Sequence, residues 1–249
     1  MKSLIFVLAL ISTTRAVTFN CPFSNITTEK YDLVSTYSCY QPIVSNINES
    51  ESLTAVYGQH KHENSNSDVK GLIIDDVTSL TFFPKAIEVF FPNLVAIRLR
   101  NTGISTLSGH ELDPWVNLFW IKIIYNPNLE RVPPNLFDLT PLVRHIGFLN
   151  NNIKHVGDGL FSNLSHIATM DFRYNYCVDQ SAYGSLIQGL INHLRNNCTD
   201  IEEPSCGDSN EIICDLQEQN QALMAMNAEM KEEMNELRVE MGEKFAELS

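Results

Sequence analysis

The sequence has little positive charge, little proline and glycine, and no long hydrophobic run. Its 17 Lys and Arg face 30 Asp and Glu, a net charge of −13, which argues against nucleic acid as a partner, since phosphate binding needs a basic face. Ten Pro and 11 Gly among 249 residues exclude a collagen-like chain, and no apolar run of about 20 residues marks a membrane span. Because 44% of the residues are hydrophobic, we expect a packed core.

Motifs for catalysis are also missing. There is no GxSxG, no P-loop and no HExxH, and the seven histidines are scattered. A metal-assisted hydrolase built on His60, His62 and Glu63 is a remote alternative, since that segment is rich in Asn and Ser and resembles a solvated loop. We therefore predict a protein that is not an enzyme, with no catalytic residue, no cofactor and no metal site.

The N-terminus predicts export. Lys2 precedes an apolar stretch from Leu4 to Ile11, and small residues before Ala16 suit signal-peptidase cleavage, so residues 1–16 are predicted to be a signal peptide. The charged C-terminus lacks the tail of a lipid-anchor signal, and we expect a secreted, extracellular protein without a membrane anchor. Six cysteines fit this compartment. Four glycosylation sequons follow, at Asn25, Asn48, Asn163 and Asn197.

Residues 69–176 repeat a hydrophobic frame. Its copies start 25, 24, 25 and 24 residues apart, at Val69, Leu94, Leu118, Val143 and Ile167. This is the leucine-rich repeat pattern, in which each copy forms a short parallel strand and the Asn at frame position nine hydrogen-bonds the tight bend. Asn126, Asn151 and Asn175 are thus predicted to be structural. The predicted fold class is α/β: a leucine-rich repeat solenoid of about five repeats with capped ends, followed by one long coiled-coil helix.

Cysteines flank the repeats on both sides. Cys21 with Cys39 would close an N-terminal cap at residues 17–68, and Cys177 with Cys198 a C-terminal cap and junction at 177–207. The second pair brackets an amphipathic stretch that predicts a helix, with apolar residues at Ile187, Leu190, Ile191 and Leu194.

The strands of the solenoid would present a concave face. Frame positions three, five and seven point to solvent, and an outward Trp beside Arg is a common composition of binding hot spots. The alternative is a solvated strand face whose Trp is partly covered by Tyr125. Such a face offers about 300 Å², less than the roughly 800 Å² that a stable interface buries. The residues predicted to bind a protein ligand are Arg98, Arg100, Trp120, Lys122, Tyr125, His145, Arg173 and Tyr174.

Residues 208–249 carry a heptad pattern. A helix of about 36 residues would be about 54 Å long, too long to bury its seam on its own solenoid, and two Asn at a positions favour a parallel dimer. Whether this is a homodimer or a heterodimer is open, since the segment is acidic. Cys206 and Cys214 would form interchain bridges or one intrachain bridge. The seam is Ile213, Leu216, Asn220, Leu223, Asn227, Met230, Met234, Leu237, Met241 and Leu248.

Together, the signal peptide, capped repeats and terminal coiled coil resemble the leucine-rich immune proteins secreted by mosquitoes and related dipteran insects. Residues 91–94 and 175–177 resemble short secreted repeat proteins of midges. The resemblance implies a haemolymph recognition or scaffold factor of innate immunity that pairs through its coil and binds a complement-like thioester protein. The alternative function is a structural matrix or salivary protein without a recognition role.

Overall fold

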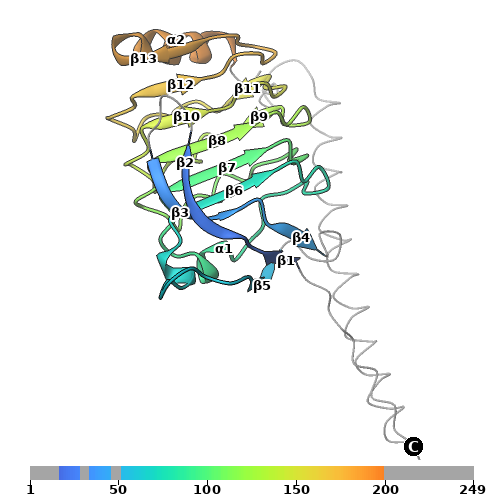
Figure 1. The fold of residues 1–249 in the computed structure, drawn as a ribbon. Helices are drawn as coiled ribbons and strands as arrows, with labels where there is room; N and C mark the ends of the chain where they lie inside the picture. The colour runs from blue at the N-terminus through green and yellow to red at the C-terminus, as the bar shows by residue number, and fades with distance from the viewer. Residues whose placement is uncertain (1–16, 29–33, 46–51, 199–249) are drawn as a thin grey trace, which may run out of the picture. The chain divides into compact units, whose positions relative to one another are not determined.

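The structure is a computed structural model that describes residues 17–28, 34–45 and 52–198. Figure 1 draws these residues in colour. The predicted signal peptide at 1–16, the sequon at Asn48, the cysteines Cys206 and Cys214, and the predicted coiled coil at 208–249 all lie outside the described residues.

The described part is a solenoid of about four turns. One eight-stranded sheet runs along it in the order β13-β12-β10-β8-β7-β6-β3-β2, as Figure 1 shows. Five parallel strands of this sheet each begin two residues after a predicted repeat start, so the repeat frame is confirmed as the source of the sheet. They are β6 (Gly71–Asp75), β7 (Ala96–Arg100), β8 (Trp120–Ile124), β10 (His145–Gly147) and β12 (Thr169–Asp171).

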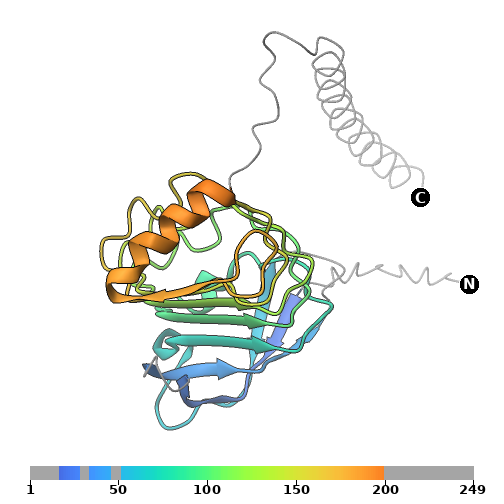
Figure 2. The same cartoon turned by 90° about the horizontal axis from the view of Figure 1, so that it is seen from above.

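The core lies between this sheet and the outer wall of the solenoid. Residues at frame position four stack along the sheet and are at most 2% exposed; they are Leu72, Ile97, Ile121, Ile146 and Met170. The outer wall is made of turns, which Figure 2 shows on the side opposite the strand face. Its regular elements are short: η1 (Asn66–Asp68), α1 (Ile87–Phe90), and the paired strands β9 (Arg131–Val132) and β11 (His155–Val156).

The asparagine ladder has the structural role that the sequence predicts. The Asn126 side chain accepts a hydrogen bond from the Thr102 amide at 2.9 Å and donates to the Ile124 carbonyl at 2.9 Å. Asn151 in turn accepts from the Asn126 amide at 2.8 Å. The repeats are therefore joined by side chains that satisfy the backbone at each bend.

The N-terminal cap has more sheet than the sequence indicates. Strands β1 (Val17–Asn20), β4 (Ile43–Ser45) and β5 (Leu53–Tyr57) form a separate three-stranded sheet. The hairpin of β2 (Phe23–Thr28) and β3 (Val34–Tyr40) joins the main sheet through residues 38–40 of β3. The predicted bridge between Cys21 and Cys39 is confirmed.

The C-terminal cap contains the predicted helix and an unpredicted strand. Helix α2 (Ile187–Asn197) buries Ile187, Leu190 and Leu194. It follows β13 (Ser181–Tyr183), which pairs antiparallel with β12, and the turn η2 (Gly184–Leu186). The predicted bridge between Cys177 and Cys198 is confirmed. None of the described helices is both long and apolar enough to cross a membrane.

Candidate functional site

The strand face of the solenoid holds a groove of 510 Å³, within the range of small-ligand sites. We call it the concave groove. Strands β6, β7, β8, β10, β12 and β13 supply its walls, so its side chains come from repeats that are far apart in sequence but adjacent in the sheet. Its lining residues are Asp75, Arg98, Arg100, Lys122, Ile124, Tyr125, Ile146, Gly147, Leu149, Thr169, Met170, Asp171, Arg173, Ser181, Ala182 and Tyr183.

Five of the eight residues that the sequence places on this face line the groove: Arg98, Arg100, Lys122, Tyr125 and Arg173. His145 lies outside the groove, and its Nδ1 is 3.0 Å from the Thr169 hydroxyl. Tyr174 follows the end of β12 and is 63% exposed. The repeat frame thus predicts where the groove lies but not which residues form its edges.

The expectation that Trp120 is exposed is wrong. Its side chain is 1% exposed although it occupies an outward strand position, and the Lys122 ammonium lies 5.0 Å from its ring centroid. The aligned positions Gly71 and Ala96 are also buried. At Gly71 the cover is the β2–β3 hairpin, which Figure 1 shows in front of the first ends of the strands; the Thr36 and Ser38 hydroxyls lie directly over Gly71. The residues at the first ends of β6, β7 and β8 therefore belong to the core.

Two arginines of the groove are held in place by carboxylates. Arg98 donates from Nε and Nη2 to the two oxygens of Asp75, with Nε–Oδ1 at 2.9 Å, and both side chains are largely buried. Arg173 makes the same two-point contact with Asp171, at 2.9 and 2.7 Å. The hydrogen bond and charge of Asp171 raise the pKa of Arg173. Such paired contacts fix the plane of the guanidinium group.

Arg100 is more loosely held. Its nearest carboxylate, on Asp76, is 3.5 Å away, and both side chains are about half exposed, so this contact is weak. Its guanidinium carbon also lies 5.4 Å from the ring centroid of Tyr125, which is 39% exposed. Arg100 and Tyr125 together form a cationic and aromatic edge that a ligand can reach.

Tyr125 and Tyr174 occupy a backbone position that bulky side chains avoid. The residue at frame position eight is left-handed in all five repeats, with φ between +50° and +60°. Asp76, Asn101 and Asn150 suit this conformation, whereas a bulky residue there is an outlier. The left-handed conformation costs about 1–2 kcal/mol for a residue of this kind. Tyr125 and Tyr174 are 39% and 63% exposed, so neither ring gains the full burial of a core residue that would compensate this cost. Strained, exposed residues are typical of functional sites.

The sequence did not assign Asp75, Asp171 or Tyr183 to the site. The two aspartates stand at outward frame positions, so their place on the face was visible, but their pairing with particular arginines depends on side-chain conformation. Tyr183 enters through β13, and the three-residue strand Ser181–Tyr183 carries no periodic signal that would predict it.

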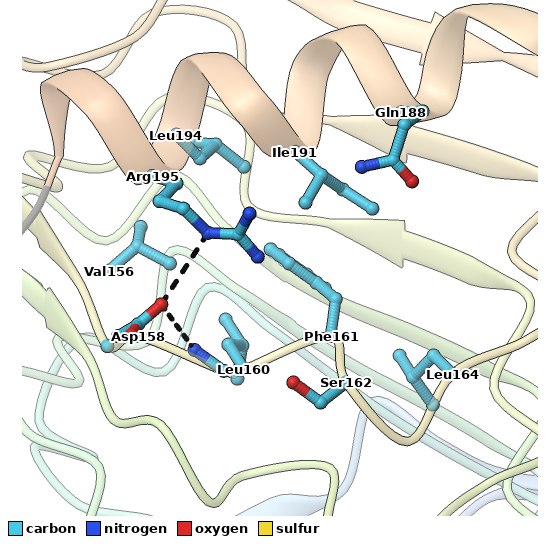
Figure 3. Close-up of a pocket in the computed structure, with 12 residues that line it drawn as sticks. Val156, Asp158, Leu160, Phe161, Ser162, Leu164, Gln188, Ile191, Leu194 and Arg195 are labelled. Carbon is cyan, nitrogen blue, oxygen red and sulfur yellow. Dashed lines mark hydrogen bonds and ion pairs between the residues drawn. The ribbon is translucent and has the colours of Figure 1, made fainter.

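A second cavity of 280 Å³ lies at the C-terminal cap, between helix α2 and the preceding turn. Figure 3 shows Ile191 of the helix pointing toward Phe161, and the Arg195 Nε lies 3.6 Å from Asp158 Oδ1 at one end of the cavity. Its walls combine apolar side chains that join the helix to the last turn with the polar residues Asp158, Ser162, Gln188 and Arg195. We interpret this cavity as a gap in the packing of the C-terminal cap against the solenoid.

The sequons at Asn25, Asn163 and Asn197 are exposed, and none of them lines the concave groove. Glycans at these positions would therefore leave the groove open. The expected glycosylation remains a prediction.

His60, the first residue of the alternative metal site, belongs to the N-terminal cap. Its ring stacks on Phe23 with centroids 3.8 Å apart. Its nitrogens lie 3.0 Å from the Tyr37 hydroxyl and 3.0 Å from the Asn66 amide oxygen. These contacts explain His60 as a packing residue. Within residues 17–28, 34–45 and 52–198, no three His, Cys, Asp or Glu side chains gather as a metal site would require.

The disulfides and the groove are thus the two features that bear on function. Disulfides of this kind fit an oxidising, extracellular environment. Comparison of the sequence with protein-family models and with curated proteins gave no match.

Proposed function

We propose that this chain is a secreted, non-enzymatic recognition protein. It is built on a short leucine-rich repeat solenoid, binds a protein ligand in the concave groove, and pairs through the heptads at 208–249. The single observation that supports recognition most is the edge formed by Arg100 and Tyr125, since both are accessible, lie 5.4 Å apart and belong to residue types enriched in binding hot spots.

The geometry limits the kind of contact. Burial of Trp120 and its neighbours removes one end of the strand face, so the accessible part is smaller than the roughly 800 Å² of a stable interface. The groove therefore suits a short segment of a partner better than a broad surface. Pairing of two chains would raise the apparent affinity of such a small site.

The resemblance to secreted insect immune proteins supports an innate immune role, as a recognition or scaffold factor. The competing function is a structural matrix or salivary protein without recognition. The ion pairs of Arg98 with Asp75 and of Arg173 with Asp171 favour this alternative, because side chains that satisfy each other need no ligand.

Two measurements test the proposal. Light scattering of the mature chain with and without residues 208–249 should give a dimer and a monomer; a monomer in both samples contradicts the pairing. Binding to extracellular proteins should weaken in the double variant Arg100→Gln/Tyr125→Asn and persist in Tyr176→Asn, a matched change at an exposed tyrosine outside the groove. Trp120 and Arg98 are poor targets, because Trp120 is buried and Arg98 is the ion-pair partner of the buried Asp75, so their loss would damage the fold.

A further inference from the structure

We propose that the concave groove binds an acidic, extended peptide segment whose two carboxylates are about four residues apart, with an apolar or aromatic residue between them. This inference rests on the proposed function and names the chemistry of its partner. Four observations support it: the charge of the groove, the orientation of its arginines, the spacing of its cations, and the position of Tyr125.

The groove is positive although the protein is acidic. Four cationic side chains line it, Arg98, Arg100, Lys122 and Arg173, against two carboxylates, Asp75 and Asp171. The whole chain, in contrast, carries a net charge of −13. A local excess of cations attracts an anionic ligand segment to the groove, even though the molecule as a whole is acidic.

The carboxylates of Asp75 and Asp171 orient their arginines without using all of their hydrogen-bond donors. A guanidinium group has five N–H donors, and Arg98 uses two of its nitrogens on Asp75, as Arg173 does on Asp171. Each arginine thus keeps donors for a second acceptor. Since its plane is already fixed, little side-chain entropy is lost when a ligand carboxylate binds.

The distance between these arginines sets the spacing in the ligand. Arg98 is on β7, and Arg173 folds back onto Asp171 of β12. The strands β8 and β10 lie between β7 and β12, so the two sites are three strand intervals apart, about 14 Å at about 4.8 Å each. An extended chain rises about 3.3 Å per residue and covers this distance in about four residues.

The middle of the groove suits an apolar side chain. Ile124 and Leu149 line it together with Tyr125. Tyr125 holds a left-handed backbone with φ of +59° that the Asn of two other repeats adopts without strain. A ring kept exposed at such a position is the group most suited to contact a ligand side chain.

The probe for this proposal is the peptide acetyl-Glu-Ala-Tyr-Ala-Glu-amide, titrated into the isotope-labelled mature chain and followed by NMR at low ionic strength. We expect saturable shifts at groove residues and weaker binding as salt is added. Replacing both Glu by Gln, or moving the two Glu next to each other, should weaken binding at least fivefold.

Variants separate a loss of contact from a loss of fold. Tyr125→Asn should weaken peptide binding at least fivefold while its Tm stays equal or rises, since Asn suits the left-handed position. Arg100→Gln should also weaken binding, and Tyr176→Asn should leave it unchanged. If Tyr125→Asn binds the peptide as well as the parent chain does, the proposal is wrong.

Other outcomes identify what fails. If the peptide does not bind but a disaccharide containing glucuronate shifts the same groove resonances, the ligand is an acidic sugar; the peptide inference is overturned and recognition by the groove stands. If neither probe binds and extracellular proteins leave the groove resonances unchanged, both the inference and the proposed function fail.

Discussion

Removing the central asparagine of the ladder should destabilise the solenoid strongly. Asn126 is fully buried, and its side chain satisfies the Thr102 amide and the Ile124 carbonyl, each at 2.9 Å. In Asn126→Ala both backbone groups lose this partner. Each unsatisfied buried group costs about 1–3 kcal/mol, so we expect the free energy of unfolding to fall by about 4 kcal/mol. The total free energy of unfolding of a whole domain is only about 5–15 kcal/mol.

Equilibrium unfolding in urea, followed by tryptophan fluorescence, measures this change. Trp115 and Trp120 are both buried, so their emission reports exposure of the core. Asn152→Ala is the matched control: that side chain contacts Glu130 at an exposed position, and its removal should change stability by at most about 0.5 kcal/mol.

The comparison of the two variants tests the reasoning. A loss below about 1 kcal/mol in Asn126→Ala, or an equal loss in both variants, would refute the claim that buried side-chain amides join the repeats. A change in the urea dependence of the free energy of unfolding would instead indicate an altered denatured or native state.

Three further predictions follow from the contacts. Asp75→Ala removes the carboxylate partner of the largely buried Arg98 guanidinium and should lower the free energy of unfolding in urea by about 3–5 kcal/mol. The exposed Asp76→Ala should lower it by at most about 1 kcal/mol, and equal losses would contradict the dependence on burial. Cys198→Ser opens a disulfide of sequence separation 21 and should lower stability by about 3 kcal/mol under oxidising conditions; no loss would contradict the expected stapling of the cap. Hydrogen bonds from the Ser65 side chain and backbone lower the pKa of Asp68. The Asp68 carboxylate therefore stabilises the folded state above its ordinary pKa, and this stabilisation is lost as the pH falls through the lowered pKa. In Ser65→Ala, NMR titration should show the Asp68 pKa move upward, and an unchanged pKa would contradict the assignment of the shift to Ser65.

The repeat frame made the solenoid predictable because each repeat is a local pattern. Strand starts and the asparagine ladder follow from spacing that recurs every 24 or 25 residues, and both disulfides follow from cysteines that flank the repeats; the structure confirms each of them. The helix of the C-terminal cap could also be predicted from a local pattern, because Leu190 and Leu194 lie on one face of a helix.

The parts that the sequence missed depend on contacts between distant segments. Alternation along β8 places Trp120 on the outward side, yet its side chain is only 1% exposed in the fold, and the N-terminal hairpin covers the aligned Gly71. Likewise, strand β13 carries Tyr183 into the groove through pairing with β12, which no local pattern of three residues specifies. The frame therefore predicted which side chains share the face, while the caps determine how much of that face is accessible.

The most direct test of recognition by the groove is a binding footprint on the protein itself. Amide resonances of the isotope-labelled mature chain are recorded before and after addition of extracellular proteins that bind it. The account predicts that shifts concentrate at groove residues such as Arg100, Tyr125 and Leu149, and that Arg100→Gln/Tyr125→Asn abolishes them. A footprint on the outer turns or on helix α2, with the groove unchanged, would contradict it.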